Sequence, residues 1–337
     1  MPAPAKRGPL FFPPPPEKAR LQYLGAVSSP DDLPRARSPF ADFILGPKKD
    51  YDKIAKPISA LLVGPRLYVC DTILNTVLVY NLMDGSAHPL AGDRGNGKIS
   101  QPNNIADDDQ GRLYVADKIR GAVLVYGPDE QFVAAWGRPQ ETRPTAVAVG
   151  KDVLYVCDTD KGKIEAWDRA TGKFLRQIGS KGSAPGQFVL PTQLALDAEG
   201  NLYVSDTGNS RVQKLSPDGQ CLLSIGSFGN SLGKFAWPKG MDVDARGRIF
   251  VADSRFCNVQ VFNPQGQLLV FFGGPGPDNG NLDLPAGLRV CSWPSIPWLT
   301  EKVAPGFDPE ELVIVVSQKG EGFINFYALA RETAEAP

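Results

Sequence analysis

Five aspartates that recur in one repeated phrase are the first residues in this chain that could do chemistry. Each ends a short apolar run, as in Leu113-Tyr114-Val115-Ala116-Asp117, and they lie 41 to 48 residues apart. They are Asp71, Asp117, Asp158, Asp206 and Asp253, and Ser317 replaces the acid in a sixth copy. A ring of carboxylates could bind a metal ion or a cationic ligand. However, an Asp that opens a turn commonly accepts hydrogen bonds from that turn's backbone, and five identical copies favour this structural role.

Polar residues that differ from copy to copy suggest a second kind of site. They either follow the proline that opens each repeat or lie on the turn after an acid. A site grafted onto a symmetric frame is expected to vary in this way. The candidates for binding an anionic or polar ligand are Asn103, Asn104, Thr192, Gln193, Lys239, Arg120 and Arg255. The alternative is a solvated channel entrance that binds nothing.

The chain has few residues that suit catalysis or metal binding. His88 is its single histidine, which excludes a histidine-cluster metal site, and we expect it on the surface. A calcium site built from Asn103, Asn104 and an acid remains an alternative, because Ca²⁺ takes oxygen ligands. The five cysteines show no Cys-x-x-Cys spacing, so we expect unpaired thiols. We therefore assign no catalytic residue, no metal ligand and no cofactor.

The charge balance argues against a polyanionic partner. Lys and Arg number 36 and Asp and Glu number 37, a net charge of −1, whereas a nucleic-acid-binding domain usually carries a basic face. The chain also has no run of 18 or more apolar residues, so no membrane-spanning helix is predicted.

The spacing of the repeat predicts the elements that carry these residues. A period of about 40–50 residues with several strands per unit is typical of propeller blades. Each of the first five acids follows a proline by 14 or 15 residues, and proline suits the first position of a strand. Pro285 precedes Ser317 by 32 residues, which indicates an insertion in the sixth unit.

The repeated phrases resemble the NHL repeat, whose blades combine a proline-led strand, a Tyr-Val-x-Asp strand, an Arg-Val-x-x strand and a strand that ends before glycine. The resemblance implies an all-β, six-bladed propeller. Blade six lacks a fourth strand after residues 323–328, and Leu21-Gln22-Tyr23-Leu24-Gly25 has the pattern of an outer strand. We therefore predict that the N-terminal strand completes the last blade and closes the ring.

The chain is accordingly divided into a proline-rich arm (1–19), the propeller (20–330) and a polar tail (331–337). Within the propeller we expect a closing strand (20–27), a linker on the top face (28–56), where the turns after the acids also lie, and an insertion on the bottom face (292–311). Ser38-Pro39-Phe40-Ala41-Asp42-Phe43 resembles a helix start. Phe40 and Phe43 in the linker and Trp293 and Trp298 in the insertion are candidate contacts for a partner, because exposed aromatic residues often anchor interfaces.

The proline-rich start, the strand after it and the phenylalanine-rich linker resemble bacterial NHL-repeat lipoproteins found alongside multihaem cytochromes. This resemblance implies a non-catalytic protein-binding scaffold outside the cytoplasm, in the periplasm or at the outer membrane. The resemblance further implies that the partner is a protein, with a multihaem cytochrome as the candidate, and that any membrane attachment would come from a removed lipid anchor. Two alternatives remain open. One is a metal-dependent, lactonase-like propeller enzyme with a calcium site at the top mouth, and the other is an RNA-binding NHL propeller.

Overall fold

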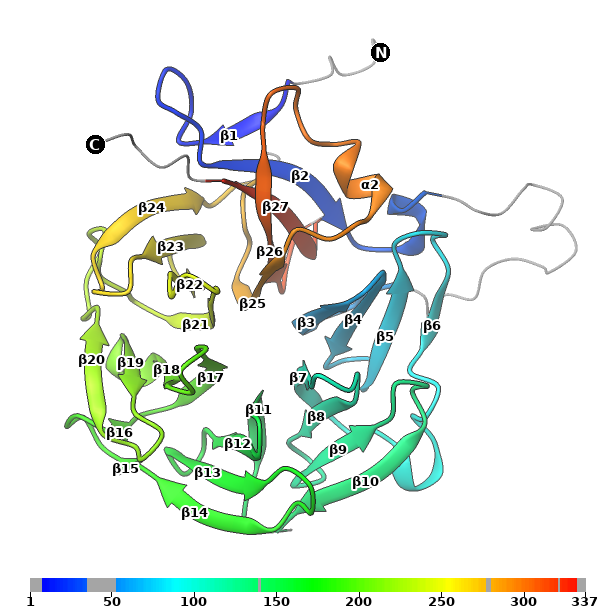
Figure 1. Cartoon of the computed structure of the whole chain (residues 1–337), viewed down its shortest axis with the longest axis vertical. Coiled ribbons are helices and arrows are strands. Elements are labelled where there is room, and N and C mark those ends of the chain that lie inside the picture. The colour runs from blue at the N-terminus through cyan, green and yellow to red at the C-terminus, as the bar shows by residue number, and fades with distance from the viewer. Residues whose placement is uncertain (1–7, 35–52, 139–140, 277–279, 321, 332–337) are drawn as a thin grey trace, which may run out of the picture.

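Six β-sheets surround one axis and confirm the predicted six-bladed, all-β propeller (Figure 1). The computed structural model describes residues 8–34, 53–138, 141–276, 280–320 and 322–331. From the axis outward, blade one consists of β3 (Pro57–Val63), β4 (Arg66–Asp71), β5 (Thr76–Asn81) and β6 (Ala87–Pro89), and blade two of β7 (Pro102–Asp107), β8 (Leu113–Asp117), β9 (Ala122–Tyr126) and β10 (Phe132–Gly137). Blade three consists of β11 (Pro144–Val149), β12 (Val153–Asp158), β13 (Lys163–Asp168) and β14 (Phe174–Ile178), and blade four of β17 (Pro191–Leu196), β18 (Leu202–Asp206), β19 (Arg211–Leu215) and β20 (Cys221–Ile225). Blade five consists of β21 (Pro238–Val243), β22 (Ile249–Asp253), β23 (Asn258–Phe262) and β24 (Leu268–Gly273).

Blade six combines the two ends of the chain, as the sequence predicts. Its inner strands are β25 (Pro285–Ser292), β26 (Pro309–Ser317) and β27 (Ile324–Ala330), and β2 (Leu21–Val27) pairs antiparallel with β27. Figure 1 shows this N-terminal strand beside the C-terminal one. Leu21 and Val27 are fully buried, so β2 is held by packing as well as by its hydrogen bonds. The closed ring leaves no long open edge at this blade.

Part of the proline-rich segment is also docked onto blade six. Leu10–Phe12 forms a short fifth strand, β1, that pairs with β2 from Leu10 opposite Tyr23 to Phe12 opposite Leu21. The Phe12 ring lies 6.1 Å from Phe272 of blade five, between ring centroids. The segment expected as an extended arm is therefore anchored from Leu10 by one strand and by aromatic contacts.

The cores lie between neighbouring blades. The second strand of each blade is buried along nearly its whole length, because both of its faces pack against another sheet. Leu, Val, Tyr and Phe suit such a strand, since branched and aromatic side chains fill the space between pleated surfaces. In this way the phrase Leu-Tyr-Val-x-Asp supplies an apolar strand that ends in a polar turn.

Hydroxyl groups that follow the repeated acids of blades three, four and five tie each of these blades to the next. Thr159 donates to the carbonyl of Pro191, Thr207 donates to Pro238, and Ser254 donates to Pro285. Each of these prolines opens an inner strand, so these bonds fix where each inner strand begins. They connect consecutive blades from three to six.

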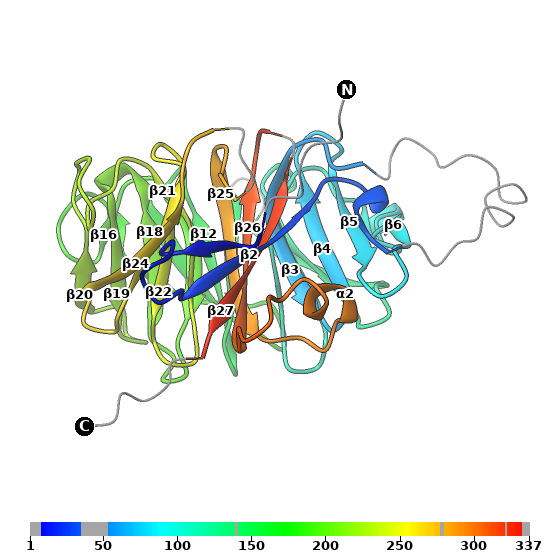
Figure 2. The ribbon, with the colours of Figure 1, turned by 90° about the horizontal axis from the view of Figure 1, so that it is seen from above.

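The two faces of the disc differ in what they carry. The turns after the acids and the loops before the blade prolines share the top face. The insertion between β25 and β26 contains the short helix α2 (Pro297–Thr300), which lies on the bottom face (Figure 2). Among the described residues, every helix is short, and none has the length and apolar character needed to span a lipid bilayer.

Candidate ligand site on the top face

The five repeated aspartates are buried and hold the top loops together. Asp71 accepts hydrogen bonds from Ala55 N at 2.7 Å and Lys56 N at 2.8 Å on the loop before its blade, and from Ile73 N and Leu74 N at 2.9 Å on the turn after it. Asp117, Asp158 and Asp253 accept backbone hydrogen bonds from the two corresponding loops in the same manner. Asp206 accepts from Val189 N on the loop before its blade, and from the Asn209 side-chain amide and Arg211 Nε after it. All five are completely buried. Their carboxylates are therefore used within the protein and do not face a ligand.

Asn104 and Gln193 use their amides to connect blades across the axis. The Asn104 side chain donates to Ser59 Oγ and to Gln193 Oε1, both at 3.2 Å, and accepts from Val147 N at 3.1 Å. These contacts join inner strands of blades one to four. The two buried amides form a polar layer below the channel mouth.

Asn103 and Thr192 lie above this layer, at the mouth itself. Thr192 Oγ1 is 2.7 Å from Thr207 Oγ1 and donates to the carbonyl of Lys239 at 3.3 Å. Asn103 Oδ1 is buried and has no hydrogen-bond partner among the described residues. A free acceptor of this kind suits a bound water or a donor group of a ligand.

The three predicted cations differ in their availability. Arg120 donates to the carbonyls of Asn96 at 2.9 Å and Lys98 at 2.7 Å, so its guanidinium is used to hold the loop before blade two. Neither Lys239 nor Arg255 forms an ion pair with any residue that the structure describes. Burial lowers the pKa of the Lys239 ammonium, and the positive charge of Lys56 lowers it further. Lys239 is thus a partly desolvated cation without a protein counter-ion in this region.

Lys239 and Arg255 line the same pocket, which lies on the top of blade five. The pocket has a volume of about 840 Å³. Its walls come from the loop between blades four and five, from the turn after Asp253 and from the end of the loop before blade six. Apart from the two cations, the lining residues are Phe228, Gly229, Asn230, Ala236, Trp237, Ser254, Phe256 and Leu284. We call this site the blade-five pocket.

The apolar wall of the blade-five pocket is unusually exposed. Phe228 is 78% exposed and Trp237 is 44% exposed. In the matching loop of the preceding repeat, Lys181 stands where Phe228 stands here, whereas Phe188 and Phe235 are both buried. The repeat therefore keeps its buried phenylalanine, while the displayed side chain changes from Lys181 to Phe228.

The predicted aromatic contacts lie elsewhere. Trp293 and Trp298 are half-buried on the bottom insertion and pack against the core between blades six and one. The Trp298 ring lies 5.5 Å from Phe326, between centroids, and Lys302 covers its other side at 4.9 Å. Much of their surface is thus used within blade six. Phe40 and Phe43 lie outside the described residues.

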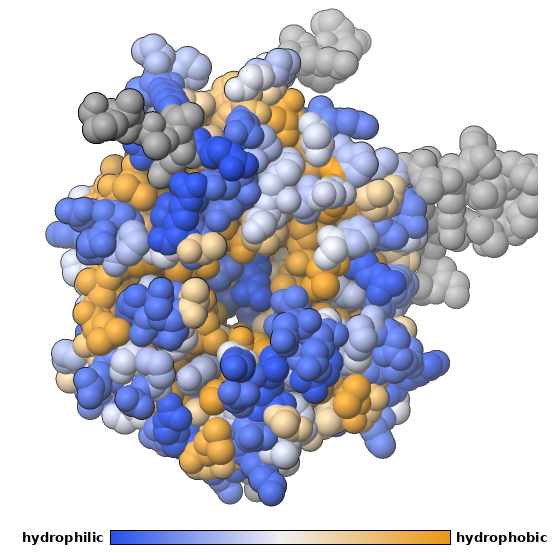
Figure 3. Space-filling view, in the orientation of Figure 1, coloured by the Kyte–Doolittle hydropathy of each residue, from blue (hydrophilic) through white to orange (hydrophobic). Residues whose placement is uncertain are grey.

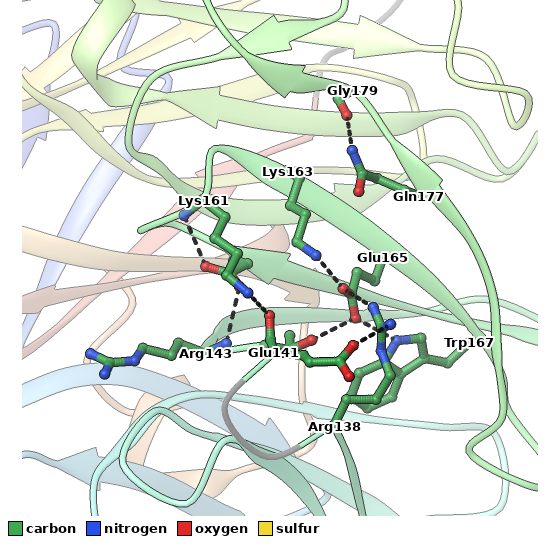
Figure 4. Close-up of polar contacts among 11 residues, drawn as sticks. Arg138, Glu141, Arg143, Lys161, Lys163, Glu165, Trp167, Gln177 and Gly179 are labelled. Atoms are coloured by element: carbon green, nitrogen blue, oxygen red, sulfur yellow. Dashed lines mark hydrogen bonds and ion pairs between the residues drawn. The ribbon is translucent and has the colours of Figure 1, made fainter.

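A buried glutamate in blade three forms a network that the sequence did not reveal. Glu165 accepts hydrogen bonds from Arg138 at 2.5 Å, Lys163 at 2.6 Å, Thr142 at 2.9 Å and the Trp167 indole at 3.0 Å (Figure 4). Burial alone would raise the pKa of Glu165, but the hydrogen bonds from Lys163 and Thr142 outweigh it, so this pKa lies below its usual value. Fully satisfied by protein donors, Glu165 fixes the loop that enters blade three.

The single histidine belongs to a similar structural cluster. Nε2 of His88 lies 3.0 Å from Oε2 of Glu130, a buried carboxylate that also contacts Arg66 and Tyr68. Burial opposes ionisation of Glu130, but the contact with His88 is among those that lower its pKa below the usual value. About half of the His88 side chain is exposed, at the junction of blades one and two.

The bottom end of the inner strands carries a separate charged group. Arg289 of blade six lies 4.0 Å from Asp107 of blade two and 3.9 Å from Asp242 of blade five. Burial raises the pKa of both carboxyls, while Arg289 opposes this effect. Figure 3 shows this face hollowed at its centre, with hydrophilic side chains in the hollow. Within the described ranges, no group of three or more His, Cys, Asp or Glu side chains is arranged to hold a metal ion.

The cysteines are all free thiols. Cys70 and Cys157 occupy the same position in blades one and three and are fully buried. Burial raises the pKa of Cys157 to about 12, so its thiol stays protonated at neutral pH. Neither thiol faces the blade-five pocket.

Comparisons with known proteins agree with this architecture. The family model described as "NHL repeat" matches residues 188–215. A segment of 46 residues is 44% identical to the human E3 ubiquitin-protein ligase TRIM32 and 41% identical to the mouse protein. This segment covers 14% of the chain and only 7% of the length of either ligase.

Solved structures with the same fold cover most of the chain at low identity. A gluconolactonase of Xanthomonas campestris is 16% identical, with a TM-score of 0.60, over 98% of this chain and 97% of that one. A virginiamycin B lyase of Staphylococcus aureus with quinupristin is 11% identical, with a TM-score of 0.56, over 81% and 95%. A protein of unknown function from Bacteroides thetaiotaomicron is 18% identical, with a TM-score of 0.62, over 92% and 75%. Together with the six blades, these similarities show that the chain folds as a six-bladed β-propeller, in which one segment, residues 188–215, matches the NHL repeat.

Proposed function

We propose that this protein is a non-catalytic binding scaffold that holds a partner protein on its top face. The observation that carries the proposal is the blade-five pocket, where exposed aromatic side chains lie beside two cations that have no counter-ion among the described residues. Aromatic residues and arginine are enriched in protein interfaces, and exposed apolar patches commonly mark them. A rigid ring supports this role, because a frame that does not deform presents its loops at low entropic cost.

The chemistry of the channel supports binding more than catalysis. The repeated acids are buried in loop contacts, and Asn104 and Gln193 are bonded to each other and to neighbouring blades. Among the described residues, the repeated acids and the Asn104 and Gln193 amides are therefore already engaged within the protein and are not free to act as general acids, bases or metal ligands. The resemblance to bacterial NHL-repeat lipoproteins leads us to propose a multihaem cytochrome as the partner and a periplasmic or outer-membrane location.

A lactonase-like hydrolase is the second candidate, since propellers of the same fold include a gluconolactonase and a streptogramin lyase. Asn103 Oδ1, which is buried and has no partner among the residues that the structure describes, favours a bound ligand at the mouth. Lactone hydrolysis measured with and without added Ca²⁺ separates the two candidates. We expect no turnover above the uncatalysed rate in either condition.

The scaffold proposal is tested by affinity capture from extracts of the source organism. The wild-type chain is compared with a Phe228→Ser/Trp237→Ser double variant. Phe271→Ser is the matched control, because Phe271 is exposed to a similar degree on the outer rim of blade five. We expect the wild type and the rim variant to recover the same protein and the double variant to lose it. Recovery that is unaffected by the double variant, or efficient lactone hydrolysis, would overturn the proposal.

A further inference from the structure

The geometry of the blade-five pocket points to the chemistry of its occupant. We infer that it binds an acidic segment of the partner protein in which a large apolar side chain lies next to a carboxylate. This inference rests on the proposed scaffold function and adds the recognition rule. It is argued from how the pocket is fixed, from its charge and from the surrounding surface.

One buried carboxylate holds both walls of the pocket in place. Asp253 accepts hydrogen bonds from Ala236 N at 2.7 Å and Trp237 N at 3.2 Å on one wall. It also accepts from Arg255 N at 2.8 Å and Phe256 N at 3.1 Å on the other wall. The backbone of Trp237 and Arg255 is therefore ordered before a ligand arrives, which reduces the entropy cost of binding.

The aromatic wall calls for a large apolar group. Phe228 and Trp237 expose much of their rings to water, and burial of an exposed aromatic surface is a main source of affinity at interfaces. The volume of about 840 Å³ exceeds what one side chain fills and suits a short stretch of peptide.

The charge of the pocket calls for an anion beside that apolar group. Lys239 and Arg255 both line it, and Lys56 lies close enough to lower the pKa of Lys239. No described carboxylate lies within ion-pair distance of any of the three. A carboxylate from a partner would pair with them, and at Lys239 it would do so in a partly desolvated setting.

The surrounding surface favours an isolated acidic group over a polyanion. Lys118 and Arg143 share Asp160 as a counter-ion at 3.0 and 3.6 Å, and Arg120 is bound to backbone carbonyls. Three of the surrounding top-face cations are thus engaged within the protein, whereas Lys239 and Arg255 have no described counter-ion, so the pocket favours a local anionic group over a nucleic-acid backbone. An acidic peptide with an aromatic or aliphatic anchor fits this distribution.

The test uses the full chain and an array of synthetic dodecapeptides. Each peptide carries a Trp, Phe or Leu next to two Asp or Glu residues, and matched peptides replace the acids by Lys or Gln or the apolar residue by Ser. We expect binding only where both features are present, with affinity that weakens as salt rises. Lys239→Gln and Arg255→Gln should each weaken binding about tenfold. Lys181→Gln, an exposed cation at the equivalent of Phe228 in the preceding loop, should leave binding unchanged.

The results separate this inference from the proposed function. Peptides that bind equally without their acids, charge variants that bind normally, or an array without any binder would each overturn the inference. In those cases the scaffold function would still be supported if the capture of a partner is lost in the Phe228→Ser/Trp237→Ser variant. A shared thermal-unfolding midpoint for all variants shows that they remain folded.

Discussion

At the scale of single residues, Asp117 shows what each repeated carboxylate contributes. It is fully buried and accepts hydrogen bonds from Ser100 N at 2.6 Å, Gln101 N at 3.1 Å and Arg120 N at 3.0 Å. Asp117→Ala leaves these donors without an acceptor, and we expect a loss of about 2–4 kcal/mol in the free energy of unfolding. Urea denaturation measures it. Asp160→Ala is the control, because that exposed carboxylate forms only surface ion pairs worth about 0–1 kcal/mol. Equal losses in the two variants would contradict the structural role of the repeat acid.

Glu165 gives a pH-dependent prediction at the same scale. Its folded-state pKa lies below the ordinary glutamate value of 4.5, so its contribution to stability is complete above about pH 4.5 and is lost as pH falls toward the lowered pKa. Glu165→Gln removes the charge that Arg138 and Lys163 bind. We expect the variant to be about 1–3 kcal/mol less stable at pH 7.

Denaturation curves at pH 7, 5, 4 and 3.5 test the sign of this effect. The difference between wild type and Glu165→Gln should stay constant from pH 7 to 5 and narrow below pH 4.5. Glu141→Gln serves as the comparison, since the Glu141 side chain is 63% exposed and shares only Arg138 with this network. A difference that stays the same down to pH 3.5 would show that Glu165 is not ionised in the folded protein.

At the scale of elements, β2 decides whether blade six is complete. Leu21, Leu24 and Val27 are buried, and burying three such side chains contributes about 5–9 kcal/mol. That is comparable to the net stability of about 5–15 kcal/mol for a whole domain. Removal of residues 1–27 should therefore unfold the ring or make it aggregate through the bare edge of β27.

Removal of residues 1–19 is the matched control for this truncation. It deletes β1, which adds only a short, half-buried strand, and keeps β2. We expect this shorter chain to stay monomeric and folded with a modest decrease in its melting temperature. Circular dichroism and size-exclusion chromatography distinguish the two truncations. A folded monomer after removal of residues 1–27 would mean that the ring does not need its N-terminal strand.

The sequence predicted the blades and the closure because both depend on local patterns. The Leu-Tyr-Val-x-Asp phrase fixes a buried strand and its turn, and the count of strands leaves blade six one short, which β2 fills. Strand β1 was not predicted, because Leu10–Phe12 lies among prolines outside the repeat and is held by contacts with β2 and Phe272. Pairing with a distant element leaves no periodic signal in so short a segment.

The candidate site was predicted only in part, for a related reason. Lys239 and Arg255 could be predicted because they occupy positions of the repeat whose residue type differs from blade to blade. The aromatic wall was missed because Phe228 and Phe235 are seven residues apart in one loop, and only the structure shows that the first is exposed and the second buried. Alignment of this loop with residues 180–190, where Lys181 matches Phe228, is the signal that would have separated them.

At the scale of the whole molecule, the inner ring is asymmetric at one level. The residue two positions after each blade proline is Ser59, Asn104, Ala146, Gln193, Gly240 or Gly287. Asn104 and Gln193 meet across the axis through their amides, whereas the two glycines let neighbouring backbones approach closely. The centre of the ring is therefore filled by the long side chains of blades two and four and by the close backbone approach of blades five and six.

Gly287→Ala tests whether this closed ring can relax. A β-carbon at Gly287 would lie 2.6 Å from the carbonyl oxygen of Ile58 and 3.1 Å from the α-carbon of Ser59, which are distances that only a backbone shift can relieve. Blade six is already joined to blades one and five, so a shift at one junction must be shared around the ring. We expect a loss of about 1–3 kcal/mol and a lower melting temperature in differential scanning calorimetry.

Ala146→Gly, at the same level in blade three, should cost only about 0.5–1 kcal/mol, because it removes a β-carbon and adds no clash. A Gly287→Ala variant as stable as the wild type would contradict this prediction. It would mean that blade six can move away from blade one at no cost, so that the packing between these two blades is looser than the structure shows.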